Sequence, residues 1–228
     1  MRYSSFVNLI IDRHFIGALG LLAAVVFALI FHEFAHGYVA KLNGDNTAKN
    51  AGRLTLNPIK HLDPFGFGLL LIAGFGWAKP VPVNSLNFRS FRKGLFTVAI
   101  AGVLVNLILA FFVFPLFKLA ENSYLSGDMN YYLYEFLFYL LNGFFAINLV
   151  LVVFNLIPVF PLDGFRVVES LTRHNNPYTK FMYQYGQYLL LGIFLVTYLF
   201  GMLFNYNIIG ELAHYLGWPI EQFWGLII

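Results

Sequence analysis

Four long apolar segments limit what this chain can fold into. They cover residues 17–40, 94–117, 131–157 and 181–204, and a helix needs about 20 mainly apolar residues to cross a bilayer. Hydrophobic residues make up 59% of the 228-residue chain, whereas charged residues make up only 11%. A soluble domain of this length could not bury so much apolar surface in one core. The sequence therefore predicts an all-α polytopic membrane protein, a single domain over residues 1–228 with a bundle of about four to six transmembrane helices.

The long connection between the first two apolar segments, residues 41–93, has a structure of its own. It is polar at both ends, and its Gly-rich middle over residues 64–77 is too short to span comfortably, so we expect this middle to be re-entrant or packed against the helix bundle. Residues 52–56 and 81–84 alternate between apolar and polar side chains as short strands do. We therefore expect them to pair in a small β-sheet on the cytoplasmic side.

Both ends of the chain are predicted to lie at the membrane surface. Residues 1–16 form an amphipathic lead-in. The last 23 residues are apolar, but Gly, Pro and Glu residues interrupt them. We interpret this tail as interfacial or partly inserted; the sequence does not decide whether residues 206–228 span the membrane.

The basic residues are distributed unevenly along the chain. Eleven of the 14 Lys and Arg lie in residues 41–93 and 158–180. Cytoplasmic loops carry an excess of these residues, so the pattern predicts a multi-pass protein of the cell membrane with both segments in the cytoplasm. No run of five or six basic residues is present, and we therefore expect no nucleic acid as a partner.

Residues 32–36 read His-Glu-Phe-Ala-His inside the first apolar segment. On a helix, His32 and His36 lie one turn apart on the same face, so both imidazoles can bind one zinc ion while Glu33 acts as general base. The alternative is a polar cluster without metal. Ionisable residues in a lipid-buried helix are energetically costly and usually functional. The chain has no Cys, so any zinc ligands must be His and carboxylate side chains.

A catalytic zinc site of this kind needs a third protein ligand. Asp163 lies at the cytoplasmic exit of the third apolar segment, at the depth of the two histidines. Local sequence alone allows it equally to cap a following helix. His61 and Asp63 are rival candidates, although their Pro neighbours are more typical of a turn.

Six motifs together resemble the site-2 protease family, the intramembrane zinc metalloproteases of peptidase family M50, in its short prokaryotic branch without a PDZ domain. They are HEFAH, GRLTLNP, HLDPFG, WAKPVPVN, AGVLVN and NLIPVFPLDGFRV, in that family's order over residues 28–170. The resemblance implies that His32, His36 and Asp163 hold one zinc ion per chain and that Glu33 activates water on the cytoplasmic side. Asn84-Ser85 departs from the Asn-Pro that typical relatives carry after VPV.

Several further residues are candidates for contacts near this site. The resemblance implies that Asn155 points into the active site, where its amide would hold the substrate backbone or an oxyanion. Asn148 lies two turns earlier on the same face; it is a second candidate for substrate binding, or it makes a helix–helix hydrogen bond. For Asn106 we expect a packing or gating role. Gly102 is expected to let two helices approach closely.

The predicted function is hydrolysis of peptide bonds in or near transmembrane segments, as in regulated intramembrane proteolysis. The expected partners are membrane proteins with a transmembrane helix and the lipid bilayer itself. A metal-ion transporter using the same His/Asp cluster is the alternative, but the first apolar segment has no ionisable residue in its far half, over residues 17–31. A catalytically silent relative that only binds membrane segments is disfavoured, because Glu33 and the three implied ligands are all present.

Overall fold

The structure, a computed structural model, describes residues 6–73, 76, 78–173, 176–204 and 207–228. Its regular elements are helices: α1 (Phe6–Ile11), α2 (Phe15–Leu42), α3 (Thr47–Asn50), α4 (Pro64–Ala73), α5 (Phe91–Leu125), α6 (Tyr131–Leu137), α7 (Gly143–Asn155), α8 (Asp163–Leu171), α9 (Pro177–Phe204) and α10 (Ile208–Gly225). A π-helical turn over Phe138–Asn142 joins α6 to α7, and short 3-10 turns cover Pro58–Lys60 and Ser85–Asn87.

Within the described part of the chain, four helices are long and apolar enough to cross a membrane: α2, α5, α9 and the continuous helix formed by α6 and α7. This confirms the predicted multi-pass membrane protein and its four apolar segments. The helix α5 is longer than the apolar stretch within it and extends to Leu125. The tail forms a helix, α10, and its placement at the interface stays a prediction.

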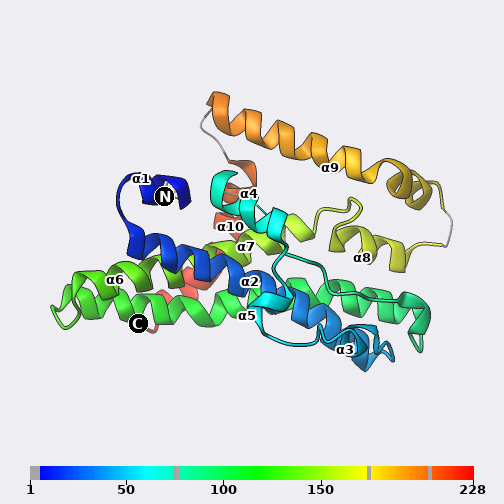
Figure 1. Cartoon of the computed structure of the whole chain (residues 1–228), viewed down its shortest axis with the longest axis horizontal. Coiled ribbons are helices and arrows are strands. Elements are labelled where there is room, and N and C mark those ends of the chain that lie inside the picture. Colours follow the sequence, from blue (N-terminus) through cyan, green and yellow to red (C-terminus); the bar gives the residue numbers. More distant parts are fainter. Residues whose placement is uncertain (1–5, 74–75, 77, 174–175, 205–206) are drawn as a thin grey trace.

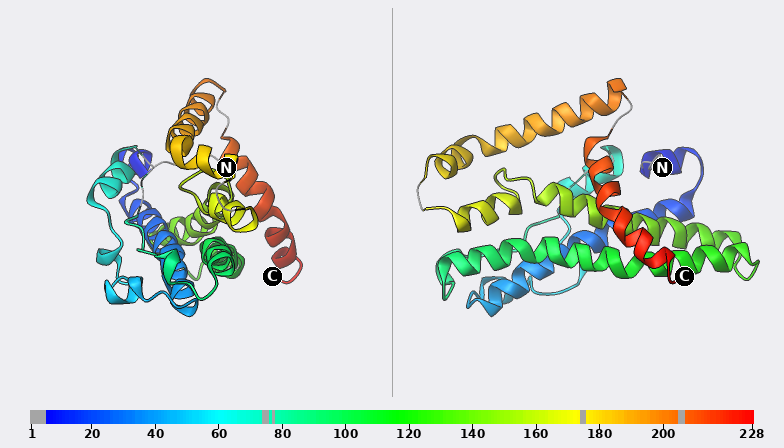
Figure 2. Two further views of the ribbon diagram at one scale, coloured as in Figure 1. Left: turned by 90° about the vertical axis from the view of Figure 1, so that its right-hand side faces the viewer. Right: turned by 180° about the vertical axis from the view of Figure 1, so that it is seen from behind.

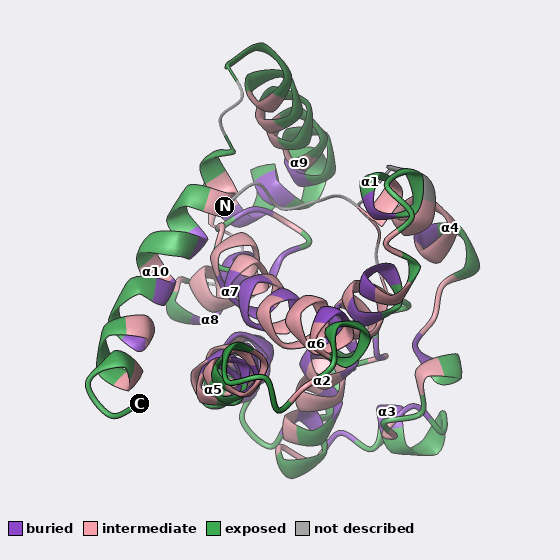
Figure 3. Ribbon diagram, turned by 90° about the vertical axis from the view of Figure 1, so that its left-hand side faces the viewer, coloured by how far each residue is buried: buried purple, intermediate pink, exposed green. Residues whose placement is uncertain are grey.

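The centre of the molecule is a bundle of α2, α5 and α7, which run side by side (Figure 1). The helix α10 crosses α7 and α5 on the back of this bundle (Figure 2), whereas α9 lies largely apart from it and contacts α7 where the rings of Phe194 and Phe154 meet. Buried residues gather where α2, α5 and α7 face one another (Figure 3). Many of those on α2 are small, including Ala24 and Ala28, which lets the neighbouring backbones approach closely.

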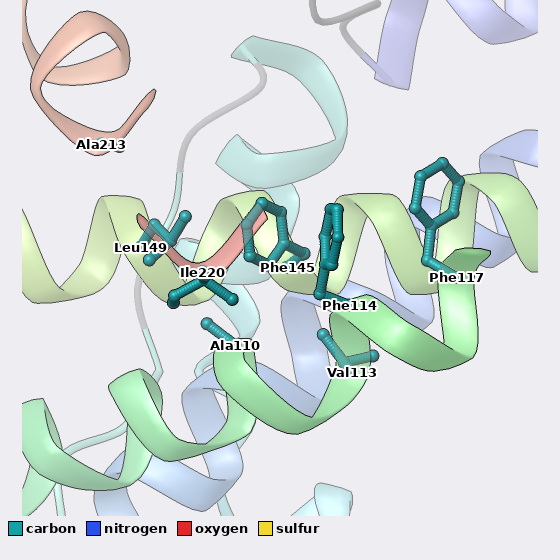
Figure 4. Close-up of a cluster of buried hydrophobic side chains, with 8 residues drawn as sticks. All are labelled: Ala110, Val113, Phe114, Phe117, Phe145, Leu149, Ala213 and Ile220. Atoms are coloured by element: carbon teal, nitrogen blue, oxygen red, sulfur yellow. The ribbon is translucent and has the colours of Figure 1, made fainter. Parts of the chain in front are cut away.

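An apolar cluster holds α5, α7 and α10 together (Figure 4). Phe114 of α5 packs against Phe145 of α7 with ring centroids 5.1 Å apart. From α10, Ala213 and Ile220 fill the remaining side of the cluster. The tail is therefore part of the packed protein, in contact with two of the central helices.

The β-sheet predicted from residues 52–56 and 81–84 is wrong. Among the described residues the structure contains no strand, only an isolated antiparallel bridge between Leu62 and Ala78. The backbone groups that a ladder would need are bonded to side chains instead, since the Val81 N–H donates to Glu33 and the Asn84 N–H to Asp45. Pro residues at positions 80 and 82 have no N–H to contribute.

Candidate metal centre

The helix α2 presents two imidazoles to the same point in space. His32 and His36 are one turn apart, and their Nε2 atoms lie 3.0 Å from each other. The third member comes from a distant part of the chain, because Asp163 Oδ2 is 3.3 Å from His32 Nε2 and 3.2 Å from His36 Nε2. No other group of three or more His, Cys, Asp or Glu that could hold a metal occurs in the described part of the chain.

Asp163 reaches the two histidines because the start of α8 packs closely against the backbone that follows α7. A Cβ atom on Gly164 would lie 2.3 Å from the Leu156 carbonyl oxygen and 2.6 Å from that of Ile157. Only glycine permits so close an approach of the two backbones. Asp163 is the first residue of α8, and the tight turn before it directs its carboxylate toward α2.

The donor set can be tested for its fit to zinc. Asp163 Oδ2 is buried and has no hydrogen-bond partner, a costly state for a carboxylate oxygen unless a cation accompanies it. A tetrahedral zinc ion with bonds of about 2.0–2.1 Å separates its ligand atoms by about 3.3 Å. The three separations of 3.0, 3.2 and 3.3 Å match this value. His32, His36 and Asp163 therefore fit a zinc ion as three ligands.

The other nitrogen of each imidazole is held by a neighbouring helix. His36 Nδ1 lies 2.7 Å from the Val98 carbonyl oxygen of α5. Because a carbonyl can only accept, Nδ1 must carry the proton, and the lone pair of a neutral ring is then on Nε2, facing Asp163. His32 Nδ1 lies 2.6 Å from Asn106 Oδ1.

Gly102 of α5 leaves room for both rings. A Cβ atom at this position would lie 2.5 Å from His32 Cε1 and 2.6 Å from His36 Nε2. The sequence predicted a close approach of two helices at Gly102. The structure shows the more specific reason, which is that the imidazoles occupy the space a side chain would need.

Glu33 borders a cleft of about 350 Å³ that opens beside the three candidate ligands. Its walls come from residues 80–88, from the start of α5 and from the turn that precedes Asp163. One carboxylate oxygen, Glu33 Oε2, accepts a hydrogen bond of 2.7 Å from the Val81 N–H. This contact orients the carboxylate through Oε2 and leaves Oε1 as the oxygen that can take a proton.

Two buried side chains fix the segment that carries Val81. Arg53 Nη2 donates to the carbonyl oxygens of Lys79 and Pro80, at 2.7 and 3.3 Å. At the other end, Asp45 accepts from the Asn84 N–H at 2.7 Å.

Hydrogen bonds also set the charge state of Asp45. Burial alone would raise the pKa of its carboxyl group, but hydrogen bonds from Thr47, Asn87 and Asn84 hold that pKa below its ordinary value. Sequence reasoning missed that Arg53 and Asp45 hold the segment with Val81, because their contacts join residues that are far apart in the chain.

The two predicted substrate-contacting asparagines lie in different surroundings. Asn155 lines the cleft, and its Nδ2 donates to the Leu151 carbonyl one turn earlier. Asn148 is fully buried between α5 and α7 and does not line the cleft; its Oδ1 accepts from Asn106 Nδ2 at 2.7 Å. Substrate binding by either residue stays a prediction.

The two rival candidates for the third ligand belong to the connection before α5. His61 is buried, and its Nε2 bonds to the Thr55 carbonyl at 2.7 Å. Asp63 accepts from the Gly66 N–H in the first turn of α4. Neither belongs to the group of possible metal ligands, and the turn interpretation given to them agrees with these contacts.

Comparison with known proteins shows which family this sequence is similar to. The sequence profile of "Peptidase family M50" matches residues 133–199. "Putative zinc metalloprotease YwhC" of Bacillus subtilis is 49% identical over 171 residues, which are 70% of this chain and 74% of that protein. "Putative zinc metalloprotease Rip2" of Mycobacterium tuberculosis H37Rv is 28% identical over 223 residues, 90% and 81% of the two chains. "Zinc metalloprotease MJ0392" of Methanocaldococcus jannaschii is 30% identical over 162 residues, but these are only 37% of its length. No solved structure gives a significant match.

Proposed function

Because this chain belongs to peptidase family M50 and is a zinc metalloprotease of that family, we propose that it hydrolyses peptide bonds in or near the transmembrane segments of other membrane proteins. The single observation that carries the proposal is the meeting of His32, His36 and Asp163 at zinc-ligand spacing beside a cleft bordered by Glu33. These groups lie on or next to membrane-spanning helices.

His32 Nε2, His36 Nε2 and Asp163 Oδ2 would hold the zinc ion. When bound, zinc would supply a Lewis acid for the attacking water and for the scissile carbonyl. Glu33 takes the proton from that water at Oε1, while the Val81 N–H holds Oε2 in place. The same carboxylate then delivers the proton to the leaving amine nitrogen.

The substrate must change shape before its backbone can react. All amides of a membrane-spanning helix are hydrogen-bonded within the helix, so a substrate unwinds locally to expose one carbonyl to the site. The unwound stretch of substrate would lie in the cleft of about 350 Å³ beside Glu33. Asn155, which lines the cleft, would bond the exposed backbone.

We assign the site to the cytoplasmic side of the cell membrane. The segments next to it, residues 41–93 and 158–180, carry most of the Lys and Arg in the chain. Water then reaches Glu33 from the cytoplasm through the cleft, without crossing the apolar half of α2.

The test is cleavage of candidate single-span membrane proteins by the purified enzyme in detergent or in liposomes, with cut sites mapped by mass spectrometry. We expect cuts in or near the membrane-spanning segment that stop with a zinc chelator and resume when zinc is restored. Zinc-dependent cuts confined to soluble domains would contradict the proposed substrate class. Zinc transport into liposomes without cleavage would favour a transporter instead.

A further inference from the structure

We propose that Asn106 and Asn148 are positioning residues: together they fix His32 in the form that leaves its Nε2 free to bind the metal. The inference rests on the zinc site of the proposed function. It concerns three side chains from three helices, α2, α5 and α7, that form one line of hydrogen bonds.

The direction of each hydrogen bond follows from the last acceptor in this line. Asn148 Nδ2 lies 2.7 Å from the Phe144 carbonyl oxygen, which can only accept. The Asn148 amide must therefore donate there with its NH2 group and turn its oxygen toward Asn106. Asn106 Nδ2 donates to that oxygen at 2.7 Å, so its own Oδ1 faces His32 as an acceptor.

The consequence reaches the imidazole of His32. Its Nδ1, 2.6 Å from Asn106 Oδ1, can only be the donor in that bond. A neutral ring with the proton on Nδ1 has its lone pair on Nε2, the atom that faces His36 and Asp163. The Phe144 carbonyl on α7 thus fixes the orientation of both asparagines, and they in turn place an acceptor oxygen beside His32 Nδ1 on α2.

Burial makes this arrangement unambiguous. Asn106 and Asn148 are both 0% exposed, and His32 is 5% exposed. Bulk water therefore does not reach the two amides to replace one of the bonds. A reversed amide would place two donors or two acceptors against each other along the line. His36 needs no such relay, because the Val98 carbonyl contacts its Nδ1 directly.

Removing the amide of Asn148 would release the orientation of Asn106. The Asn106 NH2 group could then turn toward His32 and donate a hydrogen bond to Nδ1. This bond would favour the form of the ring with its proton on Nε2. That proton occupies the position of the metal, so binding would require its displacement. Losing the hydrogen-bond partner of a metal ligand typically changes affinity about 10- to 100-fold, and the loss of Asn148 acts through that partner, Asn106.

The experiment compares zinc affinity, measured by competition with a chromogenic chelator, in Asn148→Leu and Asn148→Asp. Asn148→Leu removes the relay and is expected to weaken zinc binding about 10- to 100-fold. Asn148→Asp retains an acceptor toward Asn106, and a neutral acid also donates to the Phe144 carbonyl, so its affinity should stay within about threefold of wild type. Asn43→Leu is the matched control, since the Asn43 amide also makes an interhelical contact, from the end of α2 to Thr97 of α5, but bonds to neither histidine.

The visible spectrum of the cobalt-substituted protein should shift in Asn148→Leu and not in Asn148→Asp. Equal losses in both Asn148 variants, or wild-type affinity in Asn148→Leu, would overturn the proposal. If Asn148→Leu does not fold, the nitrogen-15 NMR shifts of His32 in the metal-free wild type decide: a proton on Nδ1 supports the relay and a proton on Nε2 refutes it. None of these readouts needs a substrate, so a protein that binds zinc as expected but cuts nothing would contradict the proposed function alone.

Discussion

The indole N–H of Trp224 in α10 donates a hydrogen bond of 2.9 Å to the carbonyl oxygen of Phe111 in α5. Pro115 lies four residues after Phe111 inside the same helix. Because proline has no N–H, the usual intrahelical partner of that carbonyl is missing. An aromatic residue near the chain end thus satisfies a backbone acceptor in a membrane-spanning helix.

Trp224→Phe should destabilise the protein by about 1–3 kcal/mol, since it leaves the Phe111 carbonyl without its donor while retaining most of the aromatic packing. Thermal or denaturant unfolding in detergent measures the change. Trp218→Phe is the control, because Trp218 lies on the same helix and is exposed. Equal effects of the two substitutions would show that the hydrogen bond to Phe111 contributes nothing measurable.

Glu33→Gln should lower the rate of cleavage by roughly 100- to 10,000-fold, the usual contribution of a general acid–base group. The amide oxygen can still accept from the Val81 N–H, so the local structure is retained. Glu33 is not one of the three candidate ligands, and zinc content measured by elemental analysis should stay at the wild-type level. Cleavage at the wild-type rate would exclude Glu33 as the base.

Gly102→Ala should weaken zinc binding, because the added methyl group would displace the imidazoles of His32 and His36. Overpacking of this kind costs about 1–3 kcal/mol, which corresponds to about 5- to 150-fold in affinity. Gly192→Ala serves as the control, since a Cβ at Gly192 in α9 would meet nothing within 4 Å. A zinc affinity unchanged in both variants would mean that the histidines do not need the space at Gly102.

Asp45→Asn should remove a pH-dependent part of the stability. The folded protein holds the pKa of Asp45 below its ordinary value of 3.8. The stabilisation is therefore fully present above that value and is lost as the pH falls through the folded-state pKa. Wild type should be more stable than Asp45→Asn by about 1–3 kcal/mol at neutral pH.

Thermal unfolding at a series of pH values from about 7 to about 3 tests this expectation, and the difference between the two proteins should shrink only at the acidic end. Asp12→Asn is the control, because Asp12 is exposed. A difference that stayed constant down to the lowest pH would rule out the carboxylate charge of Asp45 as its source.

The helical part of the fold could be read from the sequence, because apolar length alone decides which segments cross a membrane. The prediction of a β-sheet was wrong, and the sequence could not show why the described residues form none. Residues 52–56 and 81–84 have the alternation of strands, but alternation does not show that Glu33 and Asp45 compete for the Val81 and Asn84 amides. Such competition depends on residues far away in the chain.

The candidate metal centre could also be predicted only in part. The spacing of His32 and His36 places both on one face of a helix whatever surrounds it, and the structure brings Asp163 to them. Asn106, for which we expected packing or gating, also bonds His32. That contact depends on how α5 is rotated against α2, which no local pattern in the sequence reports.

The proposed ligand set is divided between two distant parts of the chain, with His32 and His36 near the start and Asp163 well past the middle. A growing polypeptide that has inserted only its first two spans holds the histidines but not the carboxylate. With this ligand set, a partly synthesised chain would lack the complete centre until translation has passed residue 163.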